Sequence, residues 1–163
     1  MSGSGTLQTA RIHTLLERNG ESRVVEAGLK IVTGDAVVDN IRDGRTGNLI
    51  ASISLEDGSL GPAVRESLES LSLTSLAVRP ATGASFEDVV LPDWTKACEL
   101  VRKASLAFAP LRALGWDIAL TPRGPVIVEA NMWWGPPNQI GGMPEILRAL
   151  ADDRGSSSKG GRP

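Results

Sequence analysis

Residues 115–131 read GWDIALTPRGPVIVEAN, in which two short apolar runs flank the turn-forming segment TPRGP. Such runs, bounded by Pro and Gly, predict two strands, 116–121 and 125–130, joined as a hairpin. If Thr121 lies opposite Pro125 across the turn, side chains alternate between the two faces of the hairpin from there on. One face is then apolar and is formed by Ile118, Leu120, Val126 and Val128.

The other face of this hairpin carries a polar set. In the same register Asp117 lies opposite Glu129, with Cβ atoms roughly 4.5–5.5 Å apart, and Asn131 points the same way. Two carboxylates at that separation repel each other unless a proton or a cation lies between them. Together with an amide oxygen they form a hard oxygen set that suits Mg²⁺ or Mn²⁺. A hairpin whose acids are merely solvent-exposed is the alternative that the spacing leaves open.

The rest of the chain predicts a mostly antiparallel sheet with packed helices. Asn19-Gly20 is a strong hairpin turn signal between two alternating segments. The apolar stripe over residues 92–114 indicates the main helix, which Pro110 is expected to kink or end. The order of elements is typical of an α+β fold. The predicted strands are 8–16, 23–31, 48–55 and a short one from 75, and the predicted helices are 62–71, 92–114 and 144–152.

Composition limits the function classes. The chain has 163 residues, enough for one domain with a core. A net charge of −2 gives no reason to expect a nucleic-acid partner. The single cysteine, Cys98, excludes an internal disulfide and fits a reducing compartment. No apolar run is long enough to cross a membrane, and the N-terminus lacks the pattern of a signal peptide, so we expect a cytoplasmic protein.

The hairpin segment resembles the C-terminal signature of ATP-grasp ligases, in which an Asp on one strand and a Glu-x-Asn on the next hold the magnesium ions of ATP. More closely, the chain resembles the sugar-transfer-associated ATP-grasp family, which is related to alpha-L-glutamate ligases. The segments TARIHTLL, AGLKIVTGDAVVDN, and RPATG followed by LPDW support this resemblance, which runs from about Thr9 to about Gly142.

The resemblance implies an ATP-dependent ligase that activates a carboxylate as an acyl-phosphate for attack by an amine or another nucleophile. Arg11 would be catalytic and hold a phosphate or the substrate carboxylate, to which a planar guanidinium is suited. Asp39 and Asn40 would contact the cofactor or substrate, with a plain turn role as the open alternative. The implied ligands are Mg²⁺ or Mn²⁺, ATP and a carboxylate substrate. The implied metal-binding residues are Asp117, Glu129 and Asn131.

We expect the chain to be the C-terminal lobe of an ATP-grasp domain, because the first lobe's phosphate-contacting lysines and Gly-rich loop are not recognised. The expected organisation is a disordered stretch at 1–7, the lobe at 8–153 and a disordered tail at 154–163. A complementing N-terminal lobe or a homo-oligomer would then complete the nucleotide site. Two other functions stay open: a non-catalytic remnant or interaction module, and a carbohydrate hydrolase or binder that uses Asp117 and Glu129.

Overall fold

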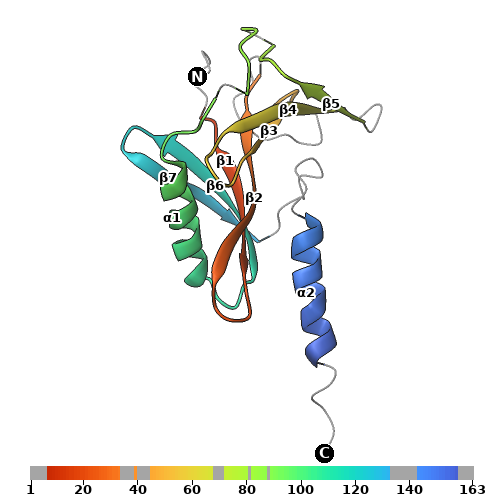
Figure 1. Cartoon of the computed structure of the whole chain (residues 1–163), viewed down its shortest axis with the longest axis vertical. Coiled ribbons are helices and arrows are strands. Elements are labelled where there is room, and N and C mark those ends of the chain that lie inside the picture. Colours follow the sequence, from red (N-terminus) through yellow and green to blue (C-terminus); the bar gives the residue numbers. More distant parts are fainter. Residues whose placement is uncertain are drawn as a thin grey trace, which may run out of the picture.

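The computed structural model describes residues 7–33, 39, 45–67, 72–80, 82–87, 89–132 and 143–157. These residues form a sheet of seven antiparallel strands in the order β5-β4-β3-β2-β1-β6-β7, with two helices (Figure 1). The α+β prediction is therefore confirmed. The strands are β1 (Ala10–Leu16), β2 (Ser22–Ile31), β3 (Leu49–Ile53), β4 (Leu60–Ser67), β5 (Ser72–Leu76), β6 (Ala113–Thr121) and β7 (Gly124–Asn131), and the helices are α1 (Trp94–Leu106) and α2 (Met143–Ser157).

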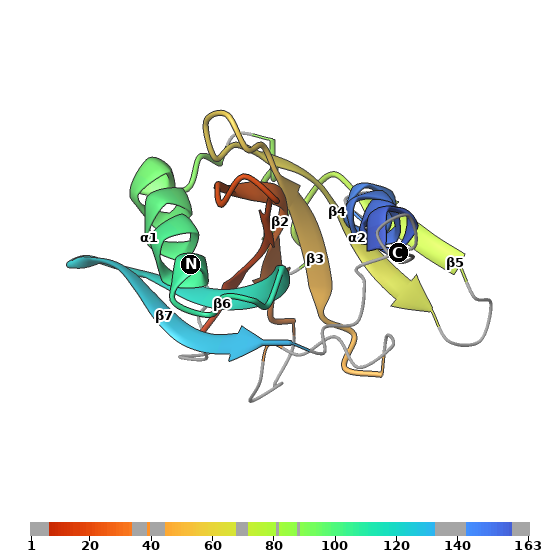
Figure 2. The same ribbon diagram turned by 90° about the horizontal axis from the view of Figure 1, so that it is seen from below.

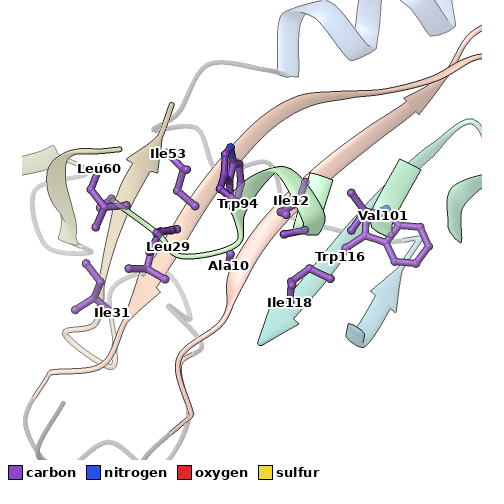
Figure 3. Packing of buried hydrophobic residues seen from close by; sticks show 14 of the residues in the cluster. Ala10, Ile12, Leu29, Ile31, Ile53, Leu60, Trp94, Val101, Trp116 and Ile118 are labelled. Carbon is purple, nitrogen blue, oxygen red and sulfur yellow. The ribbon is translucent and has the colours of Figure 1, made fainter. Parts of the chain in front are cut away.

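One face of the central strands packs against α1. Trp94, Ala97 and Val101 lie on the buried side of this helix, at the three- and four-residue spacing of a helix face. They pack against side chains of β1, β2 and β6 that point toward the helix (Figure 3). The largest buried members of this core include Ile12, Leu29, Phe86, Trp94, Trp116 and Ile118.

The opposite face of the same strands carries α2 at one end. Ile146 packs with Leu15 and Val25 in a second, smaller cluster. The two views show α1 and α2 on opposite sides of β1 and β2 (Figures 1 and 2). Because side chains alternate along a strand, Arg11 and His13 of β1 lie on the α2 face, with Leu15.

Two element predictions are wrong. Residues 62–71 were expected to form a helix, yet residues 60–67 form β4, which pairs with β3 and β5. Pro62 is tolerated there because it lies where the β3–β4 register shifts, so its missing N–H breaks no regular ladder bond. The main helix ends at Leu106, well before Pro110, and β6 already begins at Ala113.

The register of the β6–β7 hairpin differs from the predicted one near its turn. Thr121 pairs with Gly124 instead of Pro125, and Ile118 pairs with Ile127 instead of Val128. Val126 and Val128 are consequently 50% and 52% exposed, so the prediction that they form the apolar face is wrong. Ile127 packs against the core in their place.

Candidate functional site

Asp117 and Glu129 lie directly opposite each other on β6 and β7. This pairing is the predicted one, although it arises differently. The register shifts between Asp117 and Ile118, and this bulge restores the alignment that the shorter turn would have lost. Gly115 pairs with Asn131 on the same face, one step further along the strands. The hairpin therefore presents two carboxylates and an amide on one face.

The Asp117 carboxylate binds two cations from the neighbouring strands. Arg11 of β1, its direct partner across the sheet, donates from Nε to Oδ1 at 2.6 Å and from Nη2 to Oδ2 at 3.1 Å. The Nζ of Lys30, on β2, lies 2.9 Å from Oδ2. Antiparallel pairing across three strands thus brings together one acid and two bases that are far apart in sequence.

Burial and the neighbouring charges shift the pKa of Asp117 in opposite directions. The residue is only 6% exposed. Burial alone raises the pKa of a carboxyl group, but the hydrogen bonds and charges of Arg11 and Lys30 favour the ionised form. The cations prevail, and the pKa of Asp117 lies below its ordinary value. Asp117 is therefore an anion at neutral pH.

Asp39 continues this polar cluster toward the start of β1. Its Oδ2 accepts hydrogen bonds from the backbone N–H of Thr9 at 3.0 Å and from the Thr9 hydroxyl. Its Oδ1 lies 3.7 Å from Nζ of Lys30, so the Lys30 ammonium lies between two carboxylates. Of the predicted pair Asp39 and Asn40, Asn40 lies outside the described residues.

The residues at the hairpin suit a divalent cation in their donor chemistry. A carboxylate offers about four lone-pair sites, and Asp117 accepts two hydrogen bonds from Arg11, so it has capacity left for a further ligand. Glu129 is exposed and has no hydrogen bond or ion pair with another described residue. The side-chain amide of Asn131 is buried at Nδ2 without a hydrogen-bond partner among the described residues. A buried polar atom without a partner requires an explanation, and a bound ion is one that fits these donors.

Carboxylates, thiols and imidazoles alone do not make a metal site here. Within the part of the chain that the structure describes, no three His, Cys, Asp or Glu side chains cluster closely enough to hold an ion. An ion at the hairpin would therefore need the Asn131 amide oxygen. The O and N atoms of an amide are assigned by their surroundings, so turning the Asn131 amide over places Oδ1 at the orphaned position.

Lys30 is the site residue that sequence analysis missed. In AGLKIV the alternation puts Lys30 on the same strand face as Glu26, among residues that are otherwise apolar. A lysine in a strand of such apolar character is itself a signal of a buried partner, because lysine is seldom buried unpaired. The sequence of this strand does not identify Asp117 as that partner.

The same face carries a second buried acid–base pair. Nδ1 of His13 lies 2.6 Å from Oε1 of Glu26 on the adjacent strand, and both side chains are almost fully buried. The pair links β1 to β2.

A pocket lies away from these groups. Its volume is about 650 Å³, and it lies between the β1–β2 turn and the second half of α1. Its lining includes Glu17, Arg23, Glu99 and Arg102 and none of the predicted site residues.

Cys98 of α1 is half-buried, and burial raises the pKa of its thiol even though nearby Arg102 lowers it.

None of the described helices is both long enough and apolar enough to span a bilayer.

Comparison with known proteins places the chain in a family. The model of the sugar-transfer-associated ATP-grasp family matches residues 2–150, nearly the whole sequence. Searches of curated proteins and of solved structures gave no significant match. The family match covers both the β6–β7 hairpin and the strands that supply Arg11 and Lys30. The chain therefore belongs to the sugar-transfer-associated ATP-grasp family.

Proposed function

We propose that this protein is the metal-binding lobe of an ATP-dependent ligase that joins a carboxylate to an amine or a related nucleophile. The observation that carries the proposal is the pairing of Asp117 with Glu129, beside Asn131, on a face that also holds the cations of Arg11 and Lys30. Family membership supports ATP as the cosubstrate. A complementing lobe or a second copy, as the source of further nucleotide contacts, is part of the proposal.

The reaction needs a polar surface of this kind. A carboxylate oxygen of the substrate attacks the terminal phosphorus of ATP and ADP leaves, which gives an acyl-phosphate. The nucleophile then attacks the acyl carbon and phosphate departs. Both steps bring negatively charged oxygen atoms close to one another. Catalysis therefore consists mainly of positioning these atoms and neutralising their charge.

Each residue of the site has a part in this proposal. Glu129, Asn131 and Asp117 would hold a magnesium or manganese ion, which when bound supplies charge neutralisation at phosphate oxygens. Arg11 uses Nε and Nη2 on Asp117. Its Nη1 group is then left to bind a phosphate or carboxylate oxygen. Asp39, with Asn40, would line the cofactor side of the site.

Manganese binding by the full chain tests the metal-binding part of the proposal. Mn²⁺ titration followed by electron paramagnetic resonance counts free ion directly. We expect Glu129→Gln to weaken binding by about 10-fold or more, since it removes one charged ligand. Glu99→Gln changes an exposed glutamate of α1 in the same way and is expected to bind Mn²⁺ like the wild type. If the two variants bound Mn²⁺ with equal affinity, the hairpin would not be the metal site.

ATP-dependent activation of a carboxylate is tested separately. With a panel of carboxylic acids, hydroxylamine traps an acyl-phosphate as a hydroxamate, which is measured by its iron complex. Hydroxamate that requires both ATP and a divalent cation supports the ligase reaction. Hydroxamate formation that is independent of ATP would contradict it.

A further inference from the structure

Lys30 forms an ion pair with Asp117, the carboxylate that the proposed function assigns to a metal ion. Its side chain is only 6% exposed, and its Nζ lies 2.9 Å from Oδ2 of Asp117 and 3.7 Å from Oδ1 of Asp39. A buried ammonium is stable only with such partners. Lys30 is thus part of the site in the absence of ligands.

A divalent cation and the Lys30 ammonium compete for Asp117. Arg11 donates to both oxygens of this carboxylate, and the Lys30 ammonium lies 2.9 Å from Oδ2. Arg11 and Lys30 against Asp39, Asp117 and Glu129 give the site a formal charge of −1. A divalent ion alone would reverse that sign and lie near two positive side chains, which is unfavourable in a poorly solvated site.

Lys30 is the more movable of the two cations. Arg11 is held by two parallel hydrogen bonds of its rigid guanidinium fork. The Lys30 ammonium is a point charge on a flexible stem of four carbons, and Asp39 offers it a second acceptor. A small movement of Nζ toward Asp39 or toward an incoming anion would leave Oδ2 of Asp117 open to a metal ion.

We propose that Lys30 is a positioning residue that acts as an internal counter-ion, so that a divalent cation and a phosphate anion bind together far better than either binds alone. The anion draws Lys30 from Asp117, and the metal ion takes the released oxygen. Coupling of this kind is reciprocal, so the metal ion strengthens anion binding by the same factor. This inference rests on the proposed metal site at the hairpin.

The experiment measures Mn²⁺ binding by electron paramagnetic resonance, with and without inorganic phosphate, in the full chain. A protein-free titration corrects for manganese bound by phosphate itself. In the wild type we expect phosphate to tighten Mn²⁺ binding by about 10-fold, within the usual range of coupling between sites. In Lys30→Met, which keeps the length and loses the charge, we expect Mn²⁺ alone to bind about 10-fold tighter than in the wild type, with the effect of phosphate reduced to about 2-fold or less.

Two further variants separate charge from structure. Lys30→Arg retains a positive charge and is expected to keep weak binding of Mn²⁺ alone together with the phosphate effect. Lys103→Met removes an exposed charge on α1 and is expected to behave as the wild type. If circular dichroism shows that Lys30→Met does not fold, Lys30→Gln takes its place in the same comparison.

The outcomes distinguish this inference from the function on which it rests. If the wild type binds Mn²⁺ through Glu129, yet Lys30→Met binds it no tighter or phosphate has no effect, the role of Lys30 is wrong and the metal site stands. If neither the wild type nor Lys30→Met binds Mn²⁺ in a manner that depends on Glu129, the metal site fails, and the role of Lys30 fails with it.

Discussion

Asp117 is buried on β6, next to the edge strand, with Arg11 and Lys30 as its partners. Both Arg11 and Asp117 are expected from the sequence to be site residues, but in separate roles. Their contact joins positions 106 residues apart. The pattern of one strand does not state which other strand will lie beside it, so this ion pair could not be read from either segment.

Replacement of Asp117 by Asn tests the energetic importance of this pairing. The substitution removes the only carboxylate that contacts both Arg11 and Lys30 among the described residues. Loss of one partner of a buried pair leaves uncompensated charge, and we expect the free energy of unfolding at pH 7 to fall by about 3 kcal/mol. Urea denaturation measures this change. Glu129→Gln, at an exposed position without such partners, is expected to stay within about 0.5 kcal/mol of the wild type.

The difference between wild type and Asp117→Asn also depends on pH. Folding lowers the pKa of Asp117, so the ionised carboxylate stabilises the fold above the ordinary Asp pKa of about 3.9. That stabilisation is lost as the pH falls through the lower pKa of the folded state. The difference in the free energy of unfolding between the two proteins should therefore be constant from pH 7 to about pH 5 and should vanish only below about pH 4. A gap that is unchanged in strong acid would contradict the ion pair as its cause.

The β6–β7 hairpin reaches the predicted Asp117–Glu129 pairing by an unpredicted route. Its turn is one residue tighter than expected, which by itself would move every side chain of β7 to the other face. A bulge beside Asp117 reverses that shift. Val126, Ile127 and Val128 are all β-branched, so their composition gives no sign of which one faces the core.

Alanine substitutions distinguish the two registers of β7. Ile127 packs against the core, whereas Val128 is 52% exposed. We expect Ile127→Ala to lower the free energy of unfolding by about 2 kcal/mol, because it removes buried methyl groups. Val128→Ala should change it by less than about 0.5 kcal/mol. Thermal or urea denaturation gives both values. A larger loss for Val128→Ala would support the originally predicted register, with Val128 in the core.

The antiparallel sheet places the apolar core and the charged cluster on opposite faces. The α1 face of the central strands carries the main apolar core, and the opposite face carries the charged cluster at one end and α2 at the other. Alternation and the α+β element order predicted a sheet with packed helices. The strand order and the face taken by each helix depend on contacts between distant segments, and local sequence patterns do not contain that information.

Among the described residues, α2 meets the rest of the fold through one apolar cluster, against which Ala149 and Leu150 also pack, and through a few polar contacts. Ile146 is only 1% exposed and packs with Leu15 and Val25. Glu145 forms an ion pair with Arg23 at 2.7 Å, and both side chains are partly exposed to solvent. Exposed ion pairs contribute little to stability. The apolar contact of Ile146 should therefore hold most of the helix in place.

Hydrogen exchange of the full chain tests this arrangement, because a loosely held element opens on its own before the whole protein unfolds. With Ile146→Ala we expect amide exchange in α2 to become about 10-fold faster or more, which corresponds to the loss of about 1.4 kcal/mol or more of local stability. Amides of α1 and of the central strands should exchange as in the wild type. Leu147→Ala is the matched control, because its side chain is 57% exposed and the variant should leave α2 protected. If both variants accelerate α2 equally, or if α1 opens together with α2, then Ile146 is not the residue that anchors this helix to the sheet.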